Sequence, residues 1–293
     1  DDGDDDGDGD EEGDGDEEGD DDGVFRPEVP LYTNNAPLAL RYGAMLLDTL
    51  HQRKGDGRGA AHAGADNSHF WVRGIGRHGQ QACRANTEKR IDYDLFAVQG
   101  GMDLYYAEGP EGQIDRAGIF GANGTGSGES SLFGRGLGSH GLNALTMGAY
   151  WTHYGAQDWY IDALLQGTWY TIGATSVRPF SLPTTGFGIA GSLEAGYPFR
   201  LASGWLIEPQ AQLSFQHIYL DSPGDGAATV SYANVDSLVG RLGARLARTW
   251  ELDPGATDPR LITGWLRASY VHEFLGKPVV TVGTEPFDAD YSG

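Results

Sequence analysis

Apolar and polar positions alternate along much of this chain in stretches that are long enough to cross a bilayer. The clearest stretch covers residues 159–170, where one set of alternate positions is apolar and the other holds Asp162, Gln166 and Thr168. Successive side chains of a β-strand point to opposite faces, so such a segment has one apolar and one polar face. A membrane-spanning strand needs about 9–11 residues, whereas strands of soluble proteins average about 5–6. The pattern therefore predicts an all-β transmembrane barrel.

Strands are predicted from residue 69 onward, where the period of the pattern changes from helical to extended. Connections rich in Gly, Pro, Asp and Ser separate them. Consecutive antiparallel strands with short connections form an up-and-down meander. The nine predicted strands cover about residues 69–79, 91–107, 113–122, 142–154, 158–171, 186–200, 204–219, 236–250 and 261–275.

The two faces of these strands differ in chemistry. The polar faces carry long charged side chains of both signs, which a water-filled interior can hold and the core of a soluble sandwich cannot. The residues predicted to line the interior are Asp162, Gln166, Glu194, Arg200, Glu208, Gln210, Arg241, Arg245, Arg267 and Glu273. The residues predicted to face lipid are Trp159, Ile161, Leu165, Trp169, Leu193, Tyr197, Trp205, Leu213, Phe215, Leu242, Leu266 and Phe274. Aromatic residues near strand ends, typical of interfacial girdles, include Trp159, Trp169, Tyr170, Trp205 and Tyr219.

The segment before the strands is predicted to contain one helix. Residues 24–33 include two prolines and are predicted to be extended. Asn34 and Pro37 are typical of a helix cap and a first helical turn. The amphipathic helix is predicted over about residues 37–53, followed by a Gly-rich loop over residues 54–68.

Charge is concentrated at the start of the chain. Residues 1–22 consist only of Asp, Glu and Gly and hold 16 of the 42 acidic residues. Residues 1–23 are predicted to be a disordered linker, because dense like charge without apolar residues cannot offset chain entropy. Calcium binding is the alternative, but the segment lacks the fixed apolar position and closing Glu of an EF-hand loop. The rest of the chain has 26 acidic residues and 20 lysines and arginines, so its net charge is only mildly negative. Nothing in this charge indicates nucleic-acid binding.

Other motifs indicate little further chemistry. The chain has no run of 18 apolar residues, no metal-ligand spacing among its histidines and no partner for its one cysteine, Cys83. The Gly-rich residues 121–128 lack the ending of a phosphate loop and are predicted to be a flexible turn. Glu194 and Glu208 could suggest glycosidase chemistry, but arginines on the same face favour charge balance. We predict no cofactor, no metal and no enzymatic activity.

Several segments together resemble one family. Residues 26–32 read RPEVPLY, and residues 40–53 read LRYGAMLLDTLHQR. Further matching segments are residues 93–95, 99–104, 159–162, 192–197, 207–213 and 265–270. Over about residues 24–293 the chain resembles the C-terminal translocator of pertactin-like autotransporters, the type V secretion proteins of Gram-negative bacteria. Asp48 stands where the family usually has Gly.

The resemblance implies a 12-stranded barrel in the outer membrane whose pore holds a helix joined to an upstream passenger. It also implies three partners: outer-membrane lipid, the covalently attached passenger and the outer-membrane barrel-assembly machinery. Since nine strands are predicted, we interpret residues 69–293 as an incomplete barrel. The chain, which has neither an initial Met nor a signal peptide, is interpreted as a fragment. It is not expected to close, because an open edge leaves backbone groups unpaired in lipid.

We therefore expect an outer-membrane translocator that conducts its passenger to the cell surface and is then plugged by its own helix. The candidate helix contacts to the interior are Arg41, Asp48 and His51. An outer-membrane diffusion channel would not need an acidic segment leading into a helix, and a soluble all-β adhesin domain would need polar residues on both faces.

The Asn34–Asn35 pair has a separate interpretation, which is self-cleavage by cyclisation of an asparagine. The autotransporters that cleave themselves in this way carry the pair within the pore helix. Here the pair lies at the predicted start of the helix, where a cap explains it.

Overall fold

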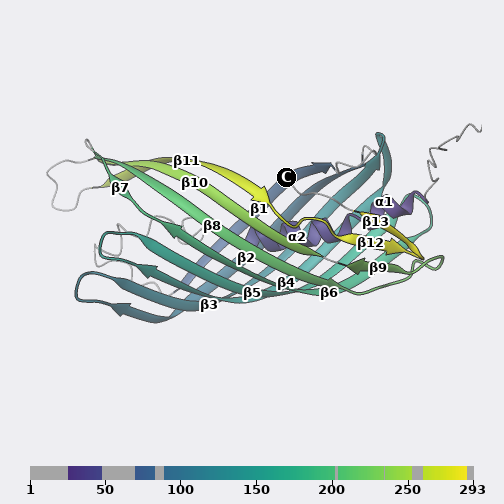
Figure 1. Cartoon of the computed structure of the whole chain (residues 1–293), viewed down its shortest axis with the longest axis horizontal. Coiled ribbons are helices and arrows are strands. Elements are labelled where there is room, and N and C mark those ends of the chain that lie inside the picture. The colour runs from purple at the N-terminus through teal and green to yellow at the C-terminus, as the bar shows by residue number, and fades with distance from the viewer. Residues whose placement is uncertain are drawn as a thin grey trace, which may run out of the picture.

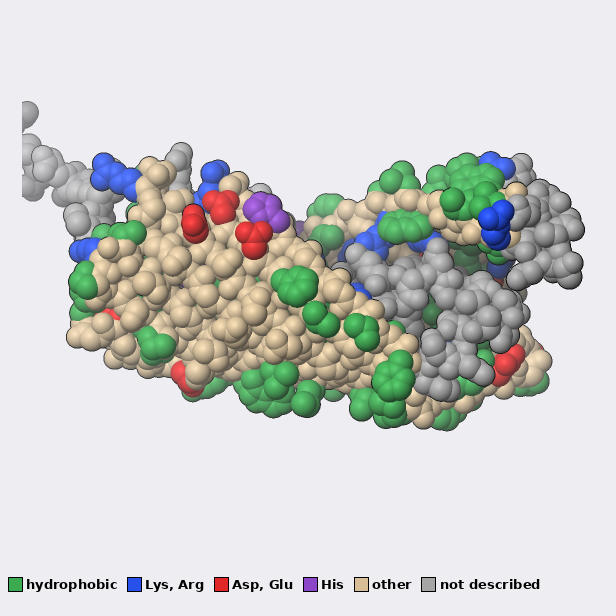
Figure 2. Space-filling model, turned by 180° about the vertical axis from the view of Figure 1, so that it is seen from behind, with side chains coloured by type: hydrophobic (Ala, Val, Ile, Leu, Met, Phe, Trp, Pro, Cys, Tyr) green, Lys and Arg blue, Asp and Glu red, His purple; other side chains and the backbone are tan. Residues whose placement is uncertain are grey.

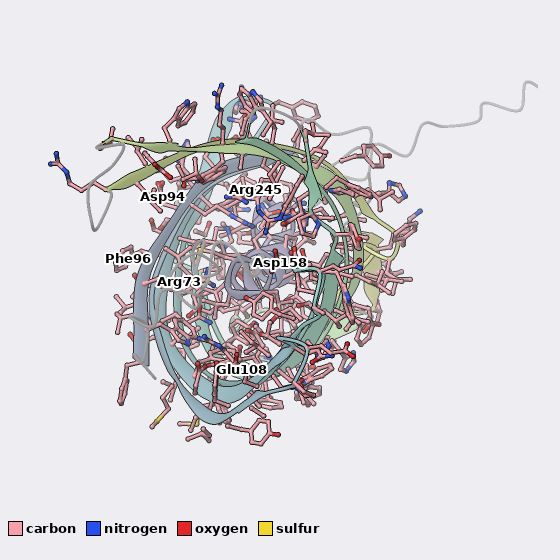
Figure 3. The ribbon with its side chains drawn as sticks, turned by 90° about the vertical axis from the view of Figure 1, so that its left-hand side faces the viewer. Arg73, Asp94, Phe96, Glu108, Asp158 and Arg245 are labelled. Atoms are coloured by element: carbon pink, nitrogen blue, oxygen red, sulfur yellow. The ribbon has the colours of Figure 1, made fainter. Side chains whose placement is uncertain are left out.

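One antiparallel sheet that curls around a helix dominates the structure (Figures 1 and 3). The computed structural model describes residues 26–47, 70–82, 89–201, 204–233, 235–252 and 260–288. Nine long strands are hydrogen-bonded in the order β1-β2-β3-β4-β5-β6-β8-β10-β11, and short β7 pairs with β8. The up-and-down meander predicted from the alternation is therefore confirmed, with β1 and β11 as the two edges of the sheet.

The long strands agree closely with the predicted ranges. Their bounds are β1 Phe70–Ala82, β2 Lys89–Glu108, β3 Ile114–Leu132, β4 Arg135–Tyr154, β5 Tyr160–Ser176, β6 Ser181–Gly196, β8 Trp205–Leu220, β10 Asp236–Glu251 and β11 Leu261–Glu273. Short β7 covers Phe199–Arg200. The main difference is β3, which continues ten residues beyond its predicted end.

The predicted flexible turn over residues 121–128 is wrong, because this segment lies inside β3. Its glycines make room for large neighbours. A Cβ atom at Gly124 would lie 2.5 Å from the ring of Tyr42, and one at Gly126 would lie 2.5 Å from the side chain of Leu95. Gly124 and Gly126 are therefore required by packing inside the sheet rather than by a turn.

Burial alternates along the strands as predicted. In β5, Asp162 and Gln166 are buried, whereas Leu165 and Trp169 on the opposite face are 61% and 50% exposed. Figure 2 shows apolar side chains spread over the outer surface of the sheet. No helix among the described residues has the length and apolar character needed to span a bilayer.

A second, smaller sheet lies at one end of the main sheet, beside the short helix α1 at Glu28–Tyr32 (Figure 1). It consists of β9 Val230–Ala233, β12 Val279–Val282 and β13 Glu285–Asp288, in the order β13-β12-β9. Val230, Val280 and Val282 form a small apolar core with residues of that helix. These strands have four residues each, too few for alternation to predict them.

Within the described residues, two helices precede the strands, α1 over Glu28–Tyr32 and α2 over Asn35–Leu46. The prediction that residues 28–32 are extended is therefore wrong. Pro30 lies in the first turn of α1, where a helix does not need the missing N–H. The predictions for residues 1–23, 48–53, 54–68 and Cys83 concern segments outside the described residues.

Candidate functional site

The interior of the curled sheet is filled by α2, which makes this interior the candidate functional site. Figure 3 shows the helix inside the ring of strands, with Arg73 and Arg245 directed toward it and Phe96 directed outward. Tyr42 and Met45 of α2 are fully buried and belong to one apolar cluster with inward side chains of the sheet. The ring of Tyr42 meets that of Tyr170 edge-on at 6.1 Å between centroids. Tyr170 thus points inward, and its predicted place in an interfacial girdle is wrong.

The wall holds α2 largely through the backbone of the helix. Gln166 of β5 donates to the carbonyl oxygen of Gly43 at 3.1 Å. Gln216 and Gln212 of β8 donate to the carbonyl oxygens of Leu40 and Leu47 at 3.3 and 3.1 Å. Arg73 of β1 donates to the carbonyl oxygen of Leu46 at 3.3 Å. Carbonyl groups in the last turn of a helix lack partners within it, so the wall stabilises the end of α2 from three strands.

The start of α2 is held by a buried chain of hydrogen bonds. Asn34 Nδ2 donates to Ser130 Oγ at 2.7 Å, and Ser130 Oγ lies 2.7 Å from His140 Nε2. His140 Nδ1 lies 3.0 Å from Asn35 Oδ1, and Asn35 Nδ2 donates to Tyr232 Oη at 3.0 Å. If the Ser130 hydroxyl donates to His140 Nε2, the Nδ1–H of His140 donates to Asn35 Oδ1. Every side chain in this series of hydrogen bonds then has a partner.

This chain of hydrogen bonds changes the interpretation of the asparagine pair. Asn34 makes no side-chain cap, so that prediction is wrong. Its amide reaches the barrel wall instead, because Ser130 supplies a buried acceptor that local geometry could not reveal. Buried polar groups are costly unless paired, so the network favours one depth of insertion for the helix.

The mouth of the interior is closed by α1. The carboxylate of Glu28, only 1% exposed, accepts hydrogen bonds from Arg178 Nε at 2.8 Å and Arg178 Nη2 at 2.9 Å. Ser176 Oγ donates to the same carboxylate at 3.1 Å. Arg26 lies over the ring of Phe180, 5.0 Å from its centroid. The turn between β5 and β6 thus grips α1 through paired charges and one aromatic ring.

A second loop holds α1 through Asp225, which lies between β8 and β9. Arg26 Nη2 and Tyr32 Oη donate to Asp225 Oδ2 at 2.7 and 2.9 Å. The backbone N–H groups of Ala227 and Ala228 donate to Oδ1 at 2.9 Å each. Burial raises the pKa of Asp225, but these two N–H groups, then Arg26 and Tyr32, lower it to about 2.

We expect the stability contributed by the contacts of Asp225 to be constant between pH 8 and 5 and to be lost between about pH 4 and pH 2, with the contacts themselves breaking near pH 2. Its folded pKa is depressed, so its stabilising contribution is present above the unfolded pKa and disappears as pH falls through the folded pKa. The check is the pH dependence of the amide proton shifts of Ala227 and Ala228, which should titrate near pH 2 and not in Asp225→Asn. A midpoint at the unfolded value would contradict these contacts.

The interior also carries charges of both signs, on the neighbouring strands β6, β8 and β10. Glu194 is buried, accepts a hydrogen bond from Tyr160 Oη at 2.5 Å and lies 3.4 Å from Arg241 Nη2. Glu208 is buried, accepts from Gln210 Nε2 at 2.9 Å and lies opposite Arg245 in the register of β8 and β10. The contacts favour charge balance over glycosidase chemistry.

The remaining interior candidates occupy different positions. Asp162 is buried and accepts from Thr152 Oγ1 at 2.5 Å. Arg267 of β11 lies opposite Arg245. Glu273 ends β11 and accepts from the backbone N–H groups of Leu238 and Leu275 at 2.8 and 3.1 Å, so it organises a strand end.

Arg200, also predicted to line the interior, lies outside the long strands. It lies in β7, and its side chain is 74% exposed and pairs with Asp158. It lies opposite Leu206 in the register of β7 and β8, on the same face of β8 as Glu208 and Gln210, so its place in the interior lining stays a prediction.

Of the helix candidates, Arg41 donates to Gln81 Oε1 at 3.3 Å. Asp48 and His51 lie outside the described residues. Sequence reasoning missed several residues that hold the helices directly, which are Glu28, Arg73, Ser130 and His140. Strand parity would have placed all but Glu28 on the inner face, but no local signal marks their partners.

The predicted lipid-facing residues lie on the outer face of the sheet. Ten of them are at least 36% exposed: Leu165, Trp169, Leu193, Tyr197, Trp205, Leu213, Phe215, Leu242, Leu266 and Phe274. Ile161 and Trp159 are half-buried. Trp159 precedes β5 and packs its ring 5.1 Å from that of His153. That these side chains contact lipid remains a prediction.

Known proteins share both sequence and fold with this chain. Over 249 residues it is 32% identical to the adhesin BmaC autotransporter of Brucella suis biovar 1, which covers 77% of this chain and 7% of that protein. It is 28% identical over 220 residues to the pertactin autotransporter of Bordetella bronchiseptica, covering 72% of this chain and 22% of that protein. The chain therefore spans less than a quarter of the length of these curated relatives.

Solved structures share the fold. The transport unit of the autotransporter AIDA-I from Escherichia coli has a TM-score of 0.69 at 15% identity and covers 92% of this chain and 85% of that one. The β-domain of the Bordetella autotransporter BrkA has a TM-score of 0.54 at 19% identity, over 76% of this chain and 94% of that one. The autotransporter β-domain family model matches residues 70–292. The chain belongs to this family of outer-membrane translocator domains of Gram-negative bacteria.

Proposed function

We propose that this domain conducts the polypeptide upstream of it across the outer membrane and is then plugged by its own residues 26–47. The observation that supports plugging is a set of hydrogen bonds to α2. Side chains of β1, β5 and β8 donate to the backbone carbonyl groups of the helix and of Leu47. A wall that binds backbone groups depends little on the side chains of the segment inside it. Such a wall suits a pore through which a whole passenger has passed before the helix settles.

The position of α1 supports one direction of transport. It lies at the end of the sheet opposite the turns β2–β3 and β4–β5 (Figure 1). Since the passenger precedes α1 in the chain, the mouth beside Arg178 and Asp225 would face the cell exterior. The opposite turns would then face the periplasm, where the barrel-assembly machinery would receive the unfolded strands.

The outer face of the sheet supports the membrane location over a soluble adhesin. Leu165, Leu213 and Leu242 are each more than half exposed, as are several residues around them. A soluble monomer rarely exposes apolar patches of this extent. The strands β2 and β4, at 20 residues each, are about 66 Å long and would extend beyond the hydrocarbon core even when tilted.

The test is surface display by the full-length protein in cells. A reporter placed upstream of residue 1 should be digested by protease added to intact cells, and a variant without residues 70–292 should keep it protected inside. A reporter that stays protected with the barrel intact would exclude translocation. Steady ion conduction by the unaltered protein would instead favour the diffusion channel, because a plugged pore should conduct little.

A further inference from the structure

The end of the sheet opposite α1 carries a surface pocket of about 640 Å³ between the turns β2–β3 and β4–β5. Asp115 near the start of β3, His153 near the end of β4 and Trp159 just before β5 line it. Glu108 and Glu111 line it as well, and the described residues of its lining include no lysine or arginine. Figure 3 looks onto this end of the molecule and labels Glu108 and Asp158. Its charge suits a cationic ligand.

Asp115 belongs to the outer face of the sheet. It lies opposite His153 in the register of β3 and β4, two strand positions from Trp151, which is outward and 42% exposed. Asp115 Oδ1 accepts from Trp151 Nε1 at 3.1 Å and lies 3.0 Å from His153 Nδ1. About one third of the Asp115 side chain is exposed, at 33%. Within the described part of the chain, no hydrogen bond reaches Oδ2.

Aromatic rings continue from this carboxylate toward the pocket. The ring of His153 lies 6.1 Å from that of Trp151 and 5.1 Å from that of Trp159. A carboxylate beside aromatic faces attracts an ammonium group both by charge and by the ring quadrupole. The carboxylate is also held in place before any ligand arrives, because its other oxygen is already bonded. Preorganisation of this kind reduces the entropic cost of binding.

We propose that this pocket binds the headgroup of an amine-headed phospholipid, with phosphatidylethanolamine as the fitting example. Its ammonium group would donate to Asp115 Oδ2 and lie against Trp159. Its acyl chains would lie along the exposed outer side chains of Ile119 and Trp151. The contact of acyl chains with Ile119 and Trp151 would be made by a lipid and not by a free amine. No group of His, Cys, Asp and Glu in the described residues is arranged to hold a metal ion. The proposal rests on the proposed function, which places this face in a membrane.

Native mass spectrometry of the full-length protein in detergent tests the proposal. Phosphatidylethanolamine and phosphatidylglycerol with the same acyl chains are offered at equal concentration, and phosphatidylethanolamine should bind about tenfold more tightly. Asp115→Asn should remove about tenfold of that affinity. Asp94→Asn is the matched control, because Asp94 is an outward carboxylate 2.8 Å from a histidine, His78, near the opposite end of the sheet. It should leave lipid binding unchanged.

Equal binding of the two lipids, or unchanged binding by Asp115→Asn, would overturn the proposal. Displacement of the lipid by phosphoethanolamine alone at similar concentration would also overturn it, because the site would then take a free amine.

If Asp115→Asn loses the heat-dependent gel shift of a folded barrel, Glu111→Gln replaces it, since Glu111 is exposed and lines the same pocket. The affinity of the Glu111→Gln variant for phosphatidylethanolamine should be about threefold lower than that of the unaltered protein. An unchanged affinity would count against the site. Unaltered protein without the gel shift would instead contradict the membrane barrel itself.

Discussion

Removal of residues 26–47 is expected to raise the single-channel conductance of the protein several-fold. These residues include α1 and α2, and most of them are buried within the curled sheet or its mouth. The wall that faces them carries glutamine, arginine and carboxylate side chains, which water and ions would solvate once the helices are gone. The measurement is the current through single molecules in a planar lipid bilayer.

The matched control for this deletion is the removal of residues 1–22, which has the same length. That acidic segment precedes the plug, and its loss should leave the conductance at the low value of the unaltered protein. Equal conductance of both deletions and the unaltered protein would mean that the helices do not block the ion path. A rise in the control alone would assign the block to the acidic segment.

Arg178→Met is expected to open the mouth more strongly than Glu28→Gln. Removing Arg178 leaves the carboxylate of Glu28 buried, at 1% exposure, with only Ser176 and the more distant Arg26 at 3.6 Å beside it. Removing a partner of a buried ion pair costs about 3–5 kcal/mol, and we expect about 3 kcal/mol here because Arg178 is half-exposed. Neutralising Glu28 leaves Arg178 able to reach water, so its cost should be nearer 1 kcal/mol.

The difference can be measured as the fraction of time for which single channels are open. A cost of about 3 kcal/mol corresponds to an increase of roughly a hundredfold, and about 1 kcal/mol to roughly fivefold. Arg135→Met is the control, because Arg135 is an exposed arginine at the same end of the sheet. The double variant of Glu28 and Arg178 should open less than Arg178→Met alone, since no buried charge is left behind. Equal effects of the two single variants would show that the mouth is not held by this ion pair.

Local sequence was sufficient to predict the nine long strands, because their evidence is contained within each segment. The alternation over residues 159–170 depends only on the two-residue period of a strand, and β5 has the predicted inner and outer faces. The same holds for β8, where Gln210, Gln212 and Gln216 face inward as the pattern requires. Apolar side chains on one face and charged ones on the other were enough to indicate a barrel with a polar interior.

Tertiary structure decided what holds the plug, because each important contact joins residues far apart in the chain. Glu28 meets Arg178, and Asn34 meets Ser130 and thereby His140. The helical state of residues 28–32 depends on burial at the mouth, and the extended state of residues 121–128 depends on space for Tyr42. Period and propensity describe one segment at a time. Partners across the interior are determined only when the strands curl around the helix and bring their inner faces against it.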